Sequence, residues 1–148
     1  MIPAFYDGDF LPDGDHMATW QEVQDRFGQT ASRRILCDQL NQLILAARGC
    51  DFLWVYIFGS FISGKPDPGD VDLMWVYRAE QLEFMRPECR DLIDYQRMKS
   101  RFAWDVFCCS DSPDVVAYLL QGWRKNKAKT KERGIIKIDL QAFEGLIL

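Results

Sequence analysis

FLWVYIFGSFISGKPDPGDVDLMWVY, residues 52–77, is the stretch that decides the fold. It begins with an apolar run, passes through Gly59-Ser60 and a polar loop rich in Gly and Pro, and enters a second apolar run at Asp70-Val71-Asp72. Because successive side chains of a strand point to opposite faces, Asp70 and Asp72 are expected on one face and Val71 on the other, in the core. The stretch therefore predicts two buried strands, with two carboxylates at the start of the second.

The two carboxylates and the Gly-Ser turn together indicate a site for metal and phosphate. Two carboxylates on one face repel each other unless a cation lies between them. Hard divalent cations such as Mg2+ take oxygen ligands of this kind and bridge them to substrate phosphates. Gly59 has no side chain where a backbone must come close, and Ser60 offers a hydroxyl and an N–H. The plainer alternative is an ordinary turn followed by two solvated residues, Asp70 and Asp72, at the start of a strand.

The same residues resemble a known signature. Gly59-Ser60, a loop of nine residues and then Asp70-Val71-Asp72-Leu73 is similar to the motif of the DNA-polymerase-beta-type nucleotidyltransferase superfamily. That superfamily also uses a third carboxylate from a later strand, and Asp105, in RFAWDVFCC, is in a suitable place for it. The plainer alternative for Asp105 is a buried ion pair with Arg97 or Arg101.

The resemblance implies a role for each of these residues. Asp70, Asp72 and Asp105 would hold two Mg2+ ions, and Asp105 would also act as the base toward an acceptor hydroxyl. Gly59 and Ser60 would bind the phosphates of an NTP, with ATP as the expected substrate. Ser63 and Lys65, in the connecting loop, are further phosphate-binding candidates, although a solvated loop lysine is the plainer interpretation of Lys65.

A second resemblance covers nearly the whole chain. The opening residues 1–28 and the closing GIIKIDL are similar to a family of small bacterial and phage proteins that carry the same nucleotidyltransferase-like motif. This second resemblance adds little about function. The superfamily resemblance implies transfer of a nucleoside monophosphate to a hydroxyl on a protein or an RNA, because superfamily members of this size resemble the minimal nucleotidyltransferases of toxin–antitoxin pairs. A partner protein is slightly preferred over tRNA or other RNA, because outside the basic tract 124–133 the surface cannot be strongly basic and the six cations of that tract alone give only weak RNA affinity. The rival hypothesis is a catalytically inactive binding module, an antitoxin or accessory protein.

Composition places limits on the class of protein. The chain has 148 residues and a formal net charge of −4 at pH 7. This length suits a single domain over residues 1–148, and the acidic balance gives no general electrostatic footprint for nucleic acid. The 5 cysteines are an odd set without Cys-x-x-Cys spacing, so buried free thiols in a reducing cytosol are expected rather than zinc or disulfides. No apolar run approaches the roughly 18 residues of a membrane span, so a cytoplasmic protein without a membrane partner is expected.

Helices and strands follow from periodicity and capping residues. Residues 1–18 are expected to form an irregular arm, with His16 as a structural residue that orders it. Thr19 and Glu22 form a capping box that begins a helix. The predicted helices cover residues 20–27, 31–48, 87–99 and 113–123, and the later predicted strands cover residues 102–109 and 135–140. The sum is an α+β fold with a small mixed β-sheet flanked by helices. The basic tract 124–133 is left open between a solvated loop and an RNA contact.

Overall fold

The fold was obtained as a computed structural model that describes residues 1–6, 9–124 and 133–141. Its centre is a sheet of five strands in the order β1-β5-β2-β3-β4. The strands are β1 (Asp15–Met17), β2 (Phe52–Phe58), β3 (Asp72–Tyr77), β4 (Val106–Ser110) and β5 (Ile135–Asp139). β2 runs antiparallel to both β3 and β5, whereas β3 with β4 and β1 with β5 are parallel pairs. The predicted fold class, an α+β fold with a mixed sheet flanked by helices, is confirmed.

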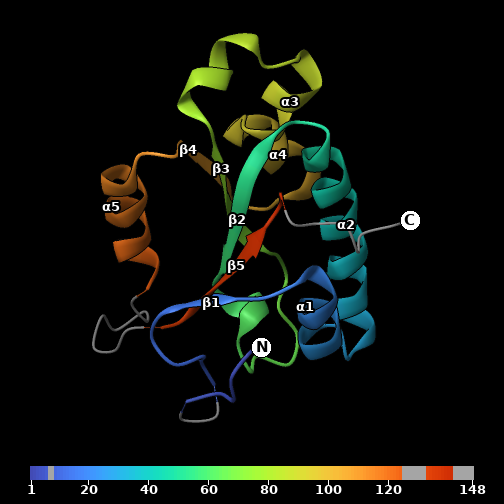
Figure 1. Cartoon of the computed structure of the whole chain (residues 1–148). Coiled ribbons are helices and arrows are strands. Elements are labelled where there is room, and N and C mark those ends of the chain that lie inside the picture. Colours follow the sequence, from blue (N-terminus) through green and yellow to red (C-terminus); the bar gives the residue numbers. More distant parts are fainter. Residues whose placement is uncertain (7–8, 125–132, 142–148) are drawn as a thin grey trace.

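Helices cover both faces of this sheet (Figure 1). They are α1 (Trp20–Phe27), α2 (Ala31–Arg48), α3 (Pro87–Leu92), α4 (Tyr95–Phe102) and α5 (Pro113–Trp123), with the 3-10 helices η1 (Ser60–Ile62) and η2 (Ala79–Phe84). The larger core lies between the sheet and α1 to α4 and includes Leu73, Trp75 and Val106. The smaller core lies between the opposite face and α5 and includes Phe58, Met74 and Leu120. Strand alternation therefore directs Asp72, like Met74, to the α5 side.

α1 and α2 have the predicted bounds, and their buried faces have a physical cause. The Thr19 side chain accepts from Glu22 N while Glu22 reaches back to Thr19 N, so the capping box is complete. In α2 the buried positions include Leu36, Leu40 and Ile44. Ile35 is 60% exposed despite its apolar side chain, whereas Arg33 is among the buried residues of α2. Arg33 lies three residues before Leu36, one helical turn away, and so shares the face that packs on the core.

The predicted helix over residues 87–99 is wrong in detail, because the chain forms two short helices. α3 ends at Leu92, and Asp94 begins α4 by accepting a hydrogen bond from Arg97 N. An Asp side chain that bonds a backbone N–H two or three residues ahead competes with helix continuation. α4 then runs to Phe102, and Ala103 adopts a left-handed conformation, so β4 begins at Val106 rather than at residue 102.

The N-terminal arm is not wholly irregular, because β1 within it pairs with β5 at the edge of the sheet. His16 lies in β1, and its Nε2 is 2.5 Å from the Pro12 carbonyl oxygen. A side chain at Gly134 would collide with His16 and Pro12, so glycine lets β5 approach the arm closely. His16 therefore contacts the arm as the structural interpretation expects.

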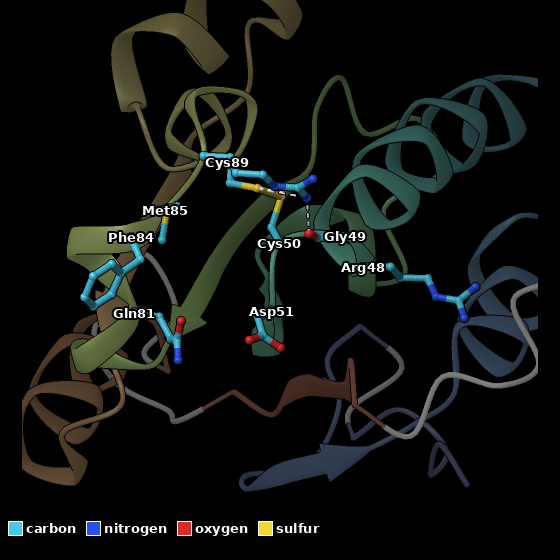
Figure 2. A pocket seen from close by; sticks show the side chains of 9 residues that line it. Arg48, Gly49, Cys50, Asp51, Gln81, Phe84, Met85 and Cys89 are labelled. Carbon is cyan, nitrogen blue, oxygen red and sulfur yellow. Dashed lines mark hydrogen bonds between the residues drawn. A yellow bond between two sulfur atoms is a disulfide. The ribbon is translucent and has the colours of Figure 1, made fainter.

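One pair of cysteines contradicts the prediction of free thiols. Cys50, which precedes β2, and Cys89, in α3, form a disulfide, whereas Cys37, Cys108 and Cys109 are free. Figure 2 shows this disulfide at the rim of a pocket, where Arg86 donates to the Gly49 carbonyl oxygen. The covalent bond joins the chain just beyond α2 to α3. Within the described ranges, no helix combines the length and the apolar character needed to cross a lipid bilayer.

Candidate active site

The candidate carboxylates gather where β2 ends and where β3 and β4 begin. Asp72 is the first residue of β3 and pairs with Phe58, the last residue of β2. The Asp105 carbonyl oxygen, just before β4, accepts a hydrogen bond from Leu73 N at 3.1 Å. Val71 is fully buried in the larger core, as predicted, so Asp70 and Asp72 flank a residue that points the opposite way. The sheet therefore brings Asp72 and Asp105 onto neighbouring strands.

Gly59 allows the close approach on which this arrangement depends. Its φ is +80°, in the region that favours glycine. A Cβ atom at this position would collide with the Asp72 Oδ2 atom and lie 3.3 Å from Asp72 Cγ. The sequence predicted a glycine where a backbone must come close, and in the structure the group that comes close is the Asp72 carboxylate. The two halves of the sequence motif thus meet in space.

Asp72 is an electrostatically unfavourable carboxylate. Burial and, to a smaller extent, the charges of Asp70 and Asp105 raise its pKa to about 6, against opposing effects of Lys99 and Arg133. Within the described part of the chain, no hydrogen bond or ion pair to the Asp72 side chain offsets this cost. A half-buried carboxylate with like charges beside it favours either a proton or a cation.

Asp105, in contrast, is well satisfied. Its Oδ1 atom accepts a hydrogen bond from the Tyr95 hydroxyl at 2.6 Å and from Lys99 Nζ at 3.0 Å. The hydrogen bond from Tyr95, followed by that from Lys99, lowers the pKa of Asp105 below its ordinary value. The ion pair that was the plainer alternative for Asp105 does form, but with Lys99 rather than with Arg97 or Arg101. Arg97 pairs with Asp91 and Asp94, and Arg101 lies over the Phe102 ring.

Neither partner of Asp105, Tyr95 or Lys99, was predicted from the sequence as a residue of the site. Tyr95 is the first residue of α4 and Lys99 lies one turn later, so the two side chains share a face of that helix. Their spacing of four residues was visible in the sequence, but the break before α4 was not predicted. Only that break fixes the direction in which this face points.

The loop after Gly59 is organised by a buried arginine. Arg33 is 6% exposed and donates to four backbone carbonyl oxygens, those of Phe27, Phe61, Ser63 and Lys65, at 2.5–3.2 Å. Burial lowers the pKa of its guanidinium, although Arg remains charged in proteins. The sequence held a signal for this role, because Arg33 is a charged residue at an apolar position of α2. It was not singled out there.

The remaining phosphate candidates differ in what they can offer. Ser63 is buried, and its hydroxyl donates to the Ser60 carbonyl oxygen at 2.7 Å and accepts from Lys65 N at 3.1 Å. Its side chain is therefore committed to the loop. Ser60 is half-buried at the start of η1, and Lys65 is exposed. Ser60 and Lys65 remain the groups of this loop with side chains open to a ligand.

Aromatic rings line the sheet face beneath the carboxylates. Phe58 and Trp123 stack with ring centroids 4.2 Å apart, and Phe107 lies 5.0 Å from Trp123. Tyr95 continues the cluster at 5.4 Å from Phe107. Phe58 is the cross-strand partner of Asp72, so this cluster lies on the same face of the sheet as the Asp72 carboxylate. Tyr95 joins this aromatic cluster to the carboxylates.

The donors suit a hard cation, although they do not form a complete cage. Among the described residues, no group of three or more His, Cys, Asp or Glu side chains is placed to hold a metal ion. The oxygens of Asp70 and Asp72 are nonetheless the donor type that Mg2+ prefers, and the pKa of Asp72 is raised by burial first and by the charges of Asp70 and Asp105 second. The residues present fit a divalent cation through the chemistry of these donors.

Other sequence candidates lie elsewhere. The pocket beside the Cys50–Cys89 disulfide contains none of the three candidate carboxylates. In the basic tract, Arg124 pairs with Asp15 of β1 and Arg133 lies over the Phe10 ring, so both ends contact the arm. Lys125, Lys127, Lys129 and Lys131 lie outside the described residues.

Comparison with known proteins identifies a family whose function is unknown. The chain matches the family of unknown function DUF6932 over residues 3–139 and therefore belongs to it. No curated protein and no solved structure matches the chain. The functional argument consequently depends on the site itself.

Proposed function

We propose that this DUF6932 member is a Mg2+-dependent nucleotidyltransferase that moves a nucleoside monophosphate from an NTP to a hydroxyl. The observation that carries the proposal is the contact between Gly59 and Asp72, with Asp70 and Asp105 beside it. It brings the turn and the carboxylates of the motif into one site. A structural role alone gives no reason for the Asp72 carboxylate, because burial and the neighbouring charges of Asp70 and Asp105 disfavour its ionised form.

Each of the candidate residues would have a separate role in this reaction. Asp70 and Asp72 would hold the cation, and Asp105 would complete the site once Lys99 moves from its carboxylate. Bound Mg2+ supplies charge neutralisation for the triphosphate and lowers the pKa of the attacking hydroxyl. The backbone around Gly59 and Ser60 would orient the phosphates, supported from behind by Arg33. Asp105 would receive the hydroxyl proton while pyrophosphate leaves.

The nucleotide and the acceptor are proposed from the same geometry. ATP is the NTP with which to begin, and the aromatic cluster of Phe58, Phe107 and Trp123 offers ring surface beside the carboxylates. A protein hydroxyl is preferred as acceptor over tRNA or other RNA. The cations at the two ends of the basic tract, Arg124 and Arg133, are engaged with the arm rather than collected into a groove. A cytoplasmic toxin–antitoxin setting is part of this proposal.

Isothermal titration with ATP and Mg2+, followed by an assay for pyrophosphate, tests the proposal. The parent chain should bind ATP only with the divalent cation, and the double variant Asp70→Asn/Asp72→Asn should lose that binding. Its thermal midpoint without metal should be no lower than that of the parent, because the substitutions remove like-charge repulsion. Asp67→Asn, an exposed acid in the same loop, is the matched control and should bind as the parent does.

Two results would count against the enzyme. If the double variant melts well below the parent, the carboxylates are structural and the site assignment fails. If the parent binds ATP with Mg2+ but releases no pyrophosphate with any hydroxyl acceptor, the inactive binding module becomes the better account.

A further inference from the structure

We propose that Tyr95 is the chain's own nucleotidyl acceptor, so that the protein modifies itself at this hydroxyl. The inference rests on the proposed function and names an acceptor for it. Tyr95 Oη lies 2.6 Å from Oδ1 of Asp105, the carboxylate assigned as base. A proton acceptor must lie within hydrogen-bond reach of the hydroxyl it activates, about 2.6–3.2 Å between heavy atoms. Tyr95 already meets that condition.

The position of Tyr95 follows from two elements. Asp94 fixes the start of α4 by capping it, which places Tyr95 in the first turn. The ring then packs against Phe107 of β4, with centroids 5.4 Å apart and planes at 33°. The aromatic contact holds one side of the ring, and the hydrogen bond to Asp105 holds its far end. The phenol is thus oriented from both ends, as a preorganised acceptor should be.

Accessibility also favours Tyr95 over the buried tyrosines. Tyr95 is 36% exposed, so an NTP can approach its hydroxyl from solvent, whereas Tyr56 is 3% exposed in the smaller core. Tyr118 is more exposed still, at 77%, but it lies on α5, and no hydrogen bond links it to a candidate carboxylate in the described structure. By exposure alone Tyr118 would be the best acceptor, but among these described tyrosines only Tyr95 combines exposure with a hydrogen bond to the proposed base.

The chemical step balances with the NTP as co-reactant. The Tyr95 oxygen attacks the α-phosphorus and forms an O–P bond as the bond from that phosphorus to the bridging α–β oxygen breaks. Pyrophosphate carries away the electron pair of the broken bond, and the phenolic proton passes to Asp105 and then to water. The product is a phosphodiester between the tyrosine and the nucleoside, with no change of oxidation state.

To test whether Tyr95 is the acceptor, the full chain is incubated with ATP and Mg2+ or Mn2+ and then analysed by intact-mass spectrometry and peptide mapping. One adenylyl group per chain is expected, on the peptide that carries Tyr95. Tyr95→Phe should reduce labelling to background, since it removes only the hydroxyl and keeps the ring against Phe107. Tyr118→Phe, the matched control, should be labelled as fully as the parent.

A mixing experiment tests whether the reaction occurs within one chain. Asp72→Asn keeps the acceptor and lacks a proposed metal ligand, while Tyr95→Phe keeps the carboxylates and lacks the acceptor. The mixture should remain unlabelled, and the rate constant of the parent should not change with protein concentration. Label on the Asp72→Asn chain in the mixture would overturn the assignment of Tyr95 as an acceptor in its own site.

A binding measurement separates failure of this inference from failure of the proposed function. With the non-transferable α,β-methylene analogue of ATP and Mg2+, NMR resonances of the Tyr95 ring should shift while those of Tyr118 stay. Metal-dependent analogue binding without the shift, or ATP binding without label on Tyr95, would overturn the inference and leave the function standing. Absence of metal-dependent nucleotide binding would overturn both.

Discussion

The two ends of α2 are fastened in different ways. Near its start, Arg33 crosses to the loop after β2 and binds backbone carbonyl oxygens without a covalent bond. Just past its end, Cys50 is bonded to Cys89 of α3, and Arg86 bridges back to Gly49 (Figure 2). The loop that the first end holds follows Gly59, which lies against Asp72, so this end is called the carboxylate end; the second end adjoins a pocket that contains none of the candidate carboxylates.

The difference shows where the protein accepts an energetic cost. At the disulfide end, groups are joined by a covalent bond and by hydrogen bonds. At the carboxylate end, Asp72 is half-buried beside Asp70 and Asp105, and its pKa is raised. Unfavourable charges of this kind concentrate at functional sites, where a ligand compensates for them. Arg33 holds the loop through hydrogen bonds to its carbonyl oxygens, and its charge is not among those that shift the pKa of Asp72.

The largest effect is expected from Arg33→Met. The substitution leaves the carbonyl oxygens of Phe61, Ser63 and Lys65 without their donor, in a site where Arg33 is buried. We expect a loss of about 3–4 kcal/mol in the free energy of unfolding, measured by urea denaturation. Arg34→Met, at the exposed neighbour, is the control and should change it by less than about 0.5 kcal/mol. Equal losses in the two variants would show that Arg33 does not anchor the loop.

The second prediction concerns the stability that the Cys50–Cys89 disulfide gives to the folded chain. Cys50→Ala/Cys89→Ala opens a link between residues separated by 39 positions, and the chain-entropy argument gives a loss of about 2–4 kcal/mol. Reductant should lower the thermal midpoint of the parent and leave that of the variant unchanged. Metal-dependent ATP binding should persist in the variant, since the two ends are independent. A parent midpoint that does not respond to reductant would contradict the role given to this bond.

The sequence predicted the elements whose signals are local. The capping box and the apolar period defined α1 and α2, continuous apolar runs defined β2 and β3, and alternation defined β5. β1 was missed because Asp15-His16-Met17 has no apolar alternation, and it becomes a strand only through pairing with β5. The Cys50–Cys89 bond was missed for a similar reason, since pairing depends on which elements the fold brings together.

The site shows the same division. Gly59, Asp70 and Asp72 could be predicted, because the motif lies within one short stretch of chain. Tyr95 and Lys99 could not, since their direction depends on the break between α3 and α4. Arg33 binds a loop about thirty residues away, a contact that helical periodicity alone does not give. Local chemistry was visible in the sequence, and the groups that support it from other elements were not.

Gly59→Ala tests whether the close contact between Gly59 and Asp72 carries the cost at the carboxylate end. The added Cβ collides with Asp72 Oδ2, and the alanine must keep the positive φ of Gly59. The collision and the backbone strain together should lower the free energy of unfolding by about 2 kcal/mol. In the Asp72→Ala background the collision disappears and only the backbone strain remains, so the cost should fall by about half. Gly69→Ala, in the same loop with open space around it, is the control. Identical costs of Gly59→Ala in both backgrounds would separate the glycine from the carboxylate.

The smallest effect, and the most specific, is the pH dependence of Asp72→Asn. The carboxyl pKa of Asp72 rises from its ordinary 3.8 to about 6 on folding, so the folded protein holds this proton when the unfolded chain has already released it. Stability contributed by the protonated group is therefore present below about pH 4 and is lost as the pH rises through about 6. Because the side chain is partly exposed, we discount the cost to about 1 kcal/mol at pH 7.

The amide that replaces the Asp72 carboxyl cannot ionise, so Asp72→Asn should be more stable than the parent by that amount at pH 7 and equal to it below about pH 4. Paired urea denaturation curves between about pH 3.5 and 8 measure the difference directly, and contributions from groups that do not interact with Asp72 cancel in the subtraction. Mg2+ at pH 7 should narrow the gap, since a cation bound by the folded parent stabilises it and not the variant. A variant that is less stable than the parent at pH 7 would mean that the Asp72 charge supports the fold. The contrast between the two ends of α2 would then be lost, because both would be built for stability.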